Sequence, residues 1–376
     1  MGERIPAEVF PPGEVIREEL DARSWSQVEL ADIMGRPPRV VSEIISGKRG
    51  ITPETAKGLG AAFGTGATFW MNLEGSYQLS RTVHDDESVQ RRAKLYAKAP
   101  VNEMIKRGWI RPSENVAVLE SQVCGFLEIQ DIENSPWHAH AAYRGKSDSE
   151  LSLAAQWAWF YRARQIAKSI SVPTYSENAL KEAVEQLKKL LLEPEETRHV
   201  PSILADCGVR FVIVEKLPHA DIDGVCFWLE GQPVVGMSTR RDKIDNFWFV
   251  LRHEIEHVLK GHGKVKEIID TNLEGKRAGT DISLPEEERI ANAAAENFCV
   301  PKDKMDSFMA RKHPFYYEKD VIAFARVVNP HPGIVVGQMQ RRLDNYAYLT
   351  KRIAKIRQFV LPGAIADGWG QTAQVA

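Results

Sequence analysis

The sequence predicts an α+β protein, with a purely helical part at the N-terminus and a small sheet further along the chain. Three observations lead to this class. The first 80 residues alternate short helical segments with glycine turns, residues 209–238 contain β-branched runs typical of strands, and residues 246–300 return to apolar helical spacing. We therefore expect a helical domain over residues 1–80, a helical connector over residues 81–195, and an α+β domain over residues 196–376.

Composition and charge exclude several classes of protein. Among the 376 residues, 49 Lys and Arg side chains are balanced by 51 Asp and Glu side chains, so the chain is not a polybasic protein. The four cysteines form no CxxC pair, which excludes a disulfide scaffold and a cysteine zinc finger and fits a reducing cytosol. No secretory leader and no apolar run of about 18 residues occur, so we expect a cytoplasmic protein without a membrane span.

Short helices separated by glycines fill the N-terminal part. The run Ser26-Gln27-Val28-Glu29 has the pattern of a capping box, and Gly35 ends the helix that it starts. A second helix is expected over residues 38–46, with proline in its first turn and Gly47 at its end. Thr52 then caps a third helix. This succession is typical of a helix-turn-helix arrangement.

The later part of the chain changes from helix to sheet and back to helix. Residues 209–214 form a buried-strand pattern, and two further apolar runs joined by Glu230-Gly231-Gln232 indicate a hairpin. The helices expected after this hairpin are 246–259 and 285–300. Residues 302–376 should form two or three more helices, with a frayed end from Gly368.

The strongest chemical signal is the run His253-Glu254-Ile255-Glu256-His257. Four residues make about one helical turn, so the two histidines project from one face and can reach one Zn²⁺ at about 2.1 Å each. Glu254 lies beside such an ion, where it can take a proton from the attacking water and pass it to the leaving amine. The alternative is a pair of packed histidines beside a surface glutamate.

A catalytic zinc site needs a third protein ligand, and two candidates compete for this place. His262 lies five residues after His257, whereas the long HExxHxxGxxH pattern requires six, so that pattern fails here. Glu288 is the better candidate because it begins a helix rich in small residues, which allows close packing against the histidine helix. The other carboxylates, which could instead serve the helix dipole or face solvent, are Glu286, Glu287 and Glu296.

Residues 200–301 resemble the ImmA/IrrE family of metallo-endopeptidases. The resemblance rests on three stretches: DGVCFWLEGQPVVGMS (223–238), DNFWFVLRHEIEHVLKGH (245–262) and EERIANAAAENFCVP (287–301). The family combines an HExxH helix with a Glu-x-x-Ala-Asn helix that ends shortly before a proline. The resemblance therefore implies a zincin-like domain with a small β-sheet and the HExxH helix.

The same resemblance implies roles for particular residues. His253, His257 and Glu288 would be the ligands of Zn²⁺, and Glu254 would be the catalytic general base. His262 is a candidate for a supporting contact, because a ligating histidine usually needs a partner for its second ring nitrogen. Two histidines and one carboxylate suit Zn²⁺, although Mn²⁺ and Fe²⁺ accept the same ligand types.

Residues 12–79 resemble the HigA-type antitoxin branch of the Cro/repressor helix-turn-helix family. The resemblance covers nearly the whole N-terminal part. The motifs that carry it are Pro12-Gly13-Glu14, SQVELA (26–31), IISGKRGIT (44–52), Phe63-Gly64-Thr65 and FWMNL (69–73). It implies operator DNA as a partner, a homodimer on a two-fold site, and a toxin as a further partner.

In such a fold the helix of residues 38–46 enters the major groove. Arg39 and Ser42 would then face base edges, while Gln27, Lys48 and Arg49 would contact phosphates. The alternative is a module that no longer binds DNA, since residues 1–80 carry 11 acidic and 8 basic side chains, a net charge of −3.

Together these features predict a zinc-dependent endopeptidase fused to a repressor-like DNA-binding module. Its substrate would be a regulator, such as a helix-turn-helix repressor, or the chain itself, in a toxin–antitoxin, phage or stress-response setting. The alternative is a DNA-binding antitoxin or transcriptional regulator whose second domain holds a non-catalytic metal or senses a ligand.

Overall fold

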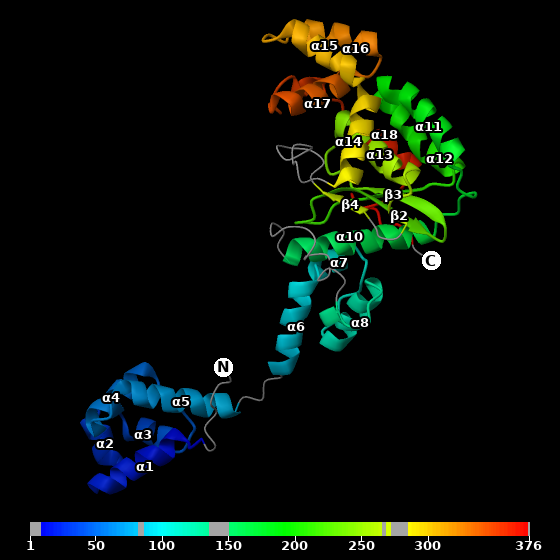
Figure 1. Cartoon of the computed structure of the whole chain (residues 1–376). Coiled ribbons are helices and arrows are strands. Elements are labelled where there is room, and N and C mark those ends of the chain that lie inside the picture. Colours follow the sequence, from blue (N-terminus) through cyan, green and yellow to red (C-terminus); the bar gives the residue numbers. More distant parts are fainter. Residues whose placement is uncertain (1–8, 82–85, 135–149, 265–267, 272–284, 375–376) are drawn as a thin grey trace. The chain divides into compact units, whose positions relative to one another are not determined.

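The chain folds as two compact units, Met1–Val89 and Gln90–Ala376 (Figure 1). This computed structural model describes residues 9–81, 86–134, 150–264, 268–271 and 285–374. A helical first unit and a second unit that combines helices with a sheet confirm the predicted α+β class. The division into three domains stays a prediction, and helices of the expected connector share one hydrophobic core with the sheet.

The described part of the first unit is entirely helical. Its helices are α1 (Pro12–Arg23), α2 (Gln27–Ile33), α3 (Pro38–Ile45), α4 (Pro53–Phe63) and α5 (Ala67–Arg81). The predicted capping box is present, because Ser26 accepts from the Glu29 amide while Glu29 accepts from the Ser26 amide. Thr52 caps α4 in the same way, by accepting from the amide of Thr55.

One continuous core holds these five helices together. Its largest fully buried side chain is Trp70, whose indole N–H donates to the hydroxyl of Thr65 at 2.8 Å. Helix α1 lies so close to α3 that a Cβ atom at Gly13 would overlap the main-chain oxygen of Ile45. The other core side chains include Ile16, Leu20, Leu30, Val41, Ile44, Leu59 and Phe63.

The second unit is built on a sheet of five strands in the order β4-β2-β3-β1-β5. The strands are β1 (Arg210–Val214), β2 (Ile222–Leu229), β3 (Gln232–Met237), β4 (Ile268–Thr271) and β5 (Ile365–Asp367). Strand β1 runs parallel to β3 and β5, and β2 runs antiparallel to β3 and β4. The predicted hairpin is confirmed as β2–β3, with positive φ at both Glu230 and Gly231, as its two-residue turn requires.

The second unit also contains helices before, between and after these strands. The helices before β1 are α6 (Asp86–Lys98), α7 (Val101–Lys106), α8 (Val116–Phe126), α10 (Glu150–Lys168), α11 (Glu177–Lys189) and α12 (Val200–Asp206), and the helix after β3 is α13 (Ile244–Leu259). Those after β4 are α14 (Glu286–Cys299), α15 (Lys302–Lys312), α16 (Glu318–Val328), α17 (Pro332–Leu343) and α18 (Arg357–Val360). Short 3-10 turns occupy Ile132–Asn134, Leu190–Leu192, Pro194–His199, Thr350–Arg352 and Leu361–Gly363.

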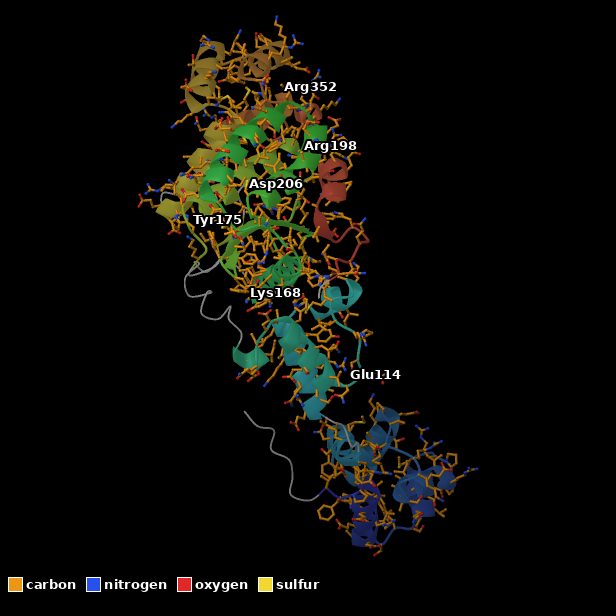
Figure 2. The ribbon with its side chains drawn as sticks, turned by 90° about the vertical axis from the view of Figure 1, so that its right-hand side faces the viewer. Glu114, Lys168, Tyr175, Arg198, Asp206 and Arg352 are labelled. Atoms are coloured by element: carbon orange, nitrogen blue, oxygen red, sulfur yellow. The ribbon has the colours of Figure 1, made fainter. Side chains whose placement is uncertain are left out.

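Successive side chains of a strand point to opposite faces of the sheet, so they belong to two hydrophobic cores. Val212 and Val214 of β1 pack with Trp159 of α10 on one face, whereas Phe211 and Ile213 pack with α12 and α13 on the other. Figure 1 shows α10 along one side of the sheet and α13 and α14 along the opposite side. In Figure 2, Lys168 marks the last residue of α10 and Asp206 that of α12.

The C-terminal residues depart from the prediction. Residues 368–374 are not a frayed end: Gly368 bridges to Gln371, and the amide of Ala373 donates to Asp367, the last residue of β5, which pairs with β1. Asp367 is buried and accepts from Arg162 of α10, a residue more than 200 positions earlier in the chain. Within the described residues, no helix combines the length and apolar character needed to cross a membrane.

Candidate functional site

Helices α13 and α14 bring together three of the residues singled out in the sequence. The Nε2 atoms of His253 and His257 lie 3.0 Å apart, because the two residues are one turn apart on α13. Glu288, in the first turn of α14, places Oε2 at 3.3 Å from the His253 nitrogen and Oε1 at 3.7 Å from the His257 nitrogen. Both histidines are fully buried, whereas the Glu288 side chain is 18% exposed, so the cluster reaches the surface on the Glu288 side.

These separations fit a small tetrahedrally coordinated cation. Ligand atoms at about 2.0–2.1 Å from Zn²⁺ lie about 3.3–3.4 Å from one another in tetrahedral geometry, and the three distances bracket that value. Three protein ligands also leave one coordination position open, as catalytic zinc sites do. Among the described residues this is the group of His, Cys, Asp and Glu side chains that could hold a metal ion.

The competing carboxylates do not join this cluster. Glu286 and Glu287 are exposed on the first turn of α14, and Glu296 lies two turns further along the helix. The charges of Glu286 and Glu287 suit the N-terminal turn of a helix and the solvent. Of the carboxylates considered in the sequence, Glu288 is the one within ligand distance of the histidines.

The second ring nitrogen of each histidine has its own partner. The Nδ1 atom of His253 lies 3.1 Å from Oδ1 of Asn292, and Nδ1 of His257 lies 2.9 Å from Nδ1 of His262. An amide oxygen can only accept, so this contact favours the His253 tautomer with its proton on Nδ1, which presents a lone pair at Nε2 toward the cluster. His262 was a predicted supporting residue, whereas Asn292 was not, although it follows Glu288 by one helical turn on the same helix.

Two side chains of strand β2 hold the main chain of His262 in position. The His262 carbonyl accepts from the indole N–H of Trp228 at 2.9 Å and from the thiol of Cys226 at 3.8 Å. The chain can fold back after α13 because Gly261 and Gly263 adopt positive φ angles. These contacts fix the loop that carries the His262 ring.

Glu254 is fully buried, unlike a glutamate on a solvated helix face. Its carboxylate lies against Gly224 of β2, where a Cβ atom would overlap Oε1. Burial of a carboxylate is costly in folding free energy, which makes such a group a candidate for function rather than stability. A glycine within a strand is typical of such a close approach by another segment, and the structure extends β2 to include Gly224.

The first unit presents a second set of predicted residues. Arg39 and Ser42 are exposed on α3, while Val41, Ile44 and Ile45 of the same helix are buried. The remaining predicted residues, Gln27, Lys48 and Arg49, are also exposed. Val40 is only half-buried, and Val41 takes the central position in the core.

The acidic residue of α3, Glu43, was not singled out in the sequence. It accepts from Arg39 Nε at 2.8 Å and lies 3.4 Å from Arg49 Nε. The hydrogen bond from Arg39 is the largest cause that holds the pKa of the Glu43 carboxyl below its usual range, so this residue is ionised at neutral pH. Two predicted DNA-contacting cations therefore meet at one carboxylate.

Helices packed around a third helix that keeps one face exposed define the first unit as a helix-turn-helix module. Residues 16–70 match the sequence profile of the helix-turn-helix family. The chain is 35% identical over 69 residues to the uncharacterized HTH-type transcriptional regulator YddM of Escherichia coli, which covers 18% of this chain and 73% of that protein. It is 37% identical over 79 residues to virulence-associated protein I of Dichelobacter nodosus, which covers 21% of this chain and 73% of that protein.

Through this first unit, the chain belongs to the helix-turn-helix family, and the unit is a DNA-binding module of the regulator type. Two solved structures are similar over small parts of the chain. A putative antidote protein of a plasmid maintenance system from Nostoc punctiforme has 30% identity and a TM-score of 0.21, and covers 23% of this chain and 96% of its own. A HigA-family addiction module antidote protein from Coxiella burnetii has 28% identity and a TM-score of 0.19. The match covers 28% of this chain and 99% of that protein.

Proposed function

We propose that this protein is a DNA-binding regulator whose second unit is a zinc-dependent endopeptidase with a zincin-like site. The observation that supports the enzymatic half is the convergence of His253, His257 and Glu288 at distances of 3.0–3.7 Å. The resemblance to ImmA/IrrE metallo-endopeptidases, noted from the sequence, favours peptide-bond hydrolysis over other reactions of HExxH proteins.

The donor set determines which ion fits. Two neutral imidazole nitrogens and one carboxylate suit Zn²⁺, which would act there as a Lewis acid toward a peptide carbonyl. The protein itself supplies the orientation of the ligands: Asn292 fixes the His253 ring, and His262 contacts the second nitrogen of His257. Such supporting contacts are a regular feature of functional metal sites.

Glu254 is the proposed general base and acid. It follows the first histidine on α13 and is fully buried, so its proton transfers would be shielded from bulk water. In the reaction it takes a proton from the attacking water and returns it to the leaving amine. Gly224 contributes by leaving the space that this carboxylate occupies.

We propose that the first unit binds the enzyme to operator DNA. Its exposed residues Arg39 and Ser42 are suited to contact base edges, and Gln27, Lys48 and Arg49 are suited to contact phosphates. The proposed operator DNA has two-fold symmetry and is bound by a homodimer. The proposed substrate is a regulator with a helix-turn-helix fold, or the chain itself. A toxin is the further partner that the HigA-type resemblance implies.

A second function is favoured by the match of residues 16–70 to DNA-binding regulators. In this alternative the chain is an antitoxin or transcriptional regulator, and the ion at His253, His257 and Glu288 is structural or senses a ligand. The two functions make the same prediction for metal content and opposite predictions for cleavage. Glu254→Gln separates them because it leaves the proposed ligands in place.

The test measures metal content and cleavage on the full chain. After zinc supplementation, elemental analysis should find about one zinc ion in the wild type and in Glu254→Gln, and none in His257→Ala. The matched control is His199→Ala, at an exposed histidine, which should keep the metal. A peptide library spanning helix-turn-helix repressor sequences, followed by mass spectrometry, should show cleavage that falls about 10²–10⁴-fold in Glu254→Gln.

Each outcome has one meaning. A wild-type chain without metal after supplementation would eliminate the peptidase. Bound zinc with no cleavage of any repressor peptide would favour the regulator with a structural ion. Zinc with cleavage that depends on Glu254 would support the enzyme.

A further inference from the structure

Glu43 joins the two arginines that flank the base-contacting helix. Its carboxylate accepts from Arg39 Nε at 2.8 Å, one turn earlier on α3, and lies 3.4 Å from Nε of Arg49, which follows the helix. The Arg39 side chain is 88% exposed and that of Arg49 is 52% exposed, whereas Glu43 is 25% exposed. The acid is therefore the better-packed member, and the two guanidinium groups extend from it toward solvent.

The main chain of Glu43 also organises the turn after α3. Its carbonyl oxygen accepts from the amide of Lys48 at 2.8 Å and from the amide of Arg49 at 3.1 Å. The hydroxyl of Ser46 donates to the same oxygen at 3.2 Å. One residue thus holds both the backbone and a side chain of the segment that carries the predicted phosphate contacts.

Folding stability does not account for this arrangement. An exposed ion pair contributes little to stability, because water screens it and two long side chains must be ordered. An acidic side chain on the surface that meets DNA also opposes binding to phosphates. The first 80 residues already carry a net charge of −3, so Glu43 adds to an unfavourable balance.

Recognition of bases gives Glu43 a use. An arginine contacts the O6 and N7 atoms of guanine with two parallel hydrogen bonds, which requires one orientation of its planar group. A carboxylate that binds Nε leaves the two terminal nitrogens of Arg39 available for such a contact. A side chain that is ordered before binding loses less conformational entropy when the complex forms.

We infer that Glu43 is a specificity-determining residue of the DNA-binding unit, which positions Arg39 for a guanine and withholds Arg39 and Arg49 from unspecific phosphate contacts. This inference rests on the DNA-binding half of the proposed function and is independent of the peptidase. Glu43 is a positioning residue, since it acts through the arginines.

The test compares two DNA duplexes and uses the full chain. The first duplex is selected by the wild-type protein from a random library, and the second has the same base composition in shuffled order. Glu43→Gln should bind the shuffled duplex more tightly and reduce the ratio of the two affinities about fivefold or more. The plot of log affinity against log salt for the shuffled duplex should steepen by about one unit for each arginine released to a phosphate.

Two controls separate positioning from charge. Glu18→Gln removes the same charge from an exposed position on α1 and should change both affinities by the same small factor. In the background of Arg39→Ala, the substitution Glu43→Gln should lose most of its effect on the ratio, because the residue that it positions is absent. The melting temperature of each variant is recorded beside the affinities.

The inference is overturned if Glu43→Gln changes both affinities by one factor, which is a pure charge effect. It is equally overturned if the ratio falls only together with the melting temperature, which is an effect on folding. A wild-type chain that selects no duplex would remove DNA binding itself, and the inference with it. A reduced ratio at an unchanged melting temperature would support it.

Discussion

Asn292 contacts His253 through the one ring nitrogen that the metal cluster does not use. Its Oδ1 atom lies 3.1 Å from Nδ1 of His253, and Asn292 follows Glu288 by one turn of α14. A single helix therefore supplies both a proposed ligand and the contact that orients another. Because the amide oxygen accepts, the contact also favours the His253 tautomer that carries its proton on Nδ1.

Removing this contact should weaken metal binding without removing a ligand. We expect Asn292→Ala to lower zinc affinity about 10–100-fold, as loss of such supporting contacts usually does. Asn292→Asp should retain the affinity, since a carboxylate also accepts from Nδ1. Competition with a chromogenic chelator measures these constants, and Asn297→Ala, at an exposed position of the same helix, serves as the control. Equal affinities for the wild type and Asn292→Ala would contradict the orienting role.

The close approach of β2 to Glu254 makes a second prediction. A Cβ atom at Gly224 would overlap the Glu254 carboxylate, so Gly224→Ala should lower the free energy of unfolding by about 1–3 kcal/mol. Glu254→Ala in the same chain should restore much of this loss, because it removes the atoms in the way. Urea unfolding provides the measurement.

A glycine without close neighbours is the control for this change. Gly125 lies in α8, and no atom from elsewhere in the chain lies within 4 Å of the place that a Cβ atom would take there. Gly125→Ala should therefore stabilise the chain by roughly 0.5–1 kcal/mol. If Gly224→Ala were as stable as Gly125→Ala, the strand would have room to move away from Glu254.

Local patterns account for what the sequence predicted well. The capping box at Ser26, the hairpin at Glu230-Gly231 and the common face of His253 and His257 each involve residues within a few positions of one another. Backbone geometry links such residues directly, so their relative placement follows from the helix or turn alone. The prediction of Glu288 as a ligand required one further observation, namely the small side chains that let α14 approach α13.

Contacts between distant segments could not be predicted in this way. The pairing of β5 with β1 joins residues about 150 positions apart, and the short run before residue 367, which lies between glycines, gave no sign of a strand. Likewise, the structure places Gly224 within β2 and against Glu254, and the sequence predicted neither relationship. The interaction of Glu43 with Arg39 follows helical spacing, yet charged residues at that spacing also occur on ordinary solvated faces.

Buried Cys299 makes stability depend on pH in the alkaline range. Burial raises the pKa of this thiol from 9.0 to about 12. The folded chain therefore keeps a proton that the unfolded chain releases, so the contribution is complete below about pH 9 and is lost as pH rises toward 12. Between pH 9 and 11 the free energy of unfolding should fall more steeply in the wild type than in Cys299→Ala, by a difference that grows toward about 1.4 kcal/mol per pH unit.

Urea unfolding at pH 9, 10 and 11 gives the two slopes. Cys124→Ala is the control, since that thiol is buried to a smaller extent, and the slope should change less. Parallel pH dependence in the wild type and Cys299→Ala would show that the thiol does not hold its proton as inferred.

The buried ion pair between Arg162 and Asp367 should be essential to the second unit. Arg162 donates through Nε at 2.9 Å, and Asp367 also accepts from the indole of Trp109 at 2.9 Å. Asp367→Ala leaves the guanidinium buried without its counter-charge, so we expect a loss of about 3–5 kcal/mol in the free energy of unfolding. Glu318→Ala removes the partner of Arg352 in a surface pair and should cost less than about 1 kcal/mol. Similar losses in the two variants would mean that water reaches Arg162 once the carboxylate is gone, and that β5 contributes little to the fold.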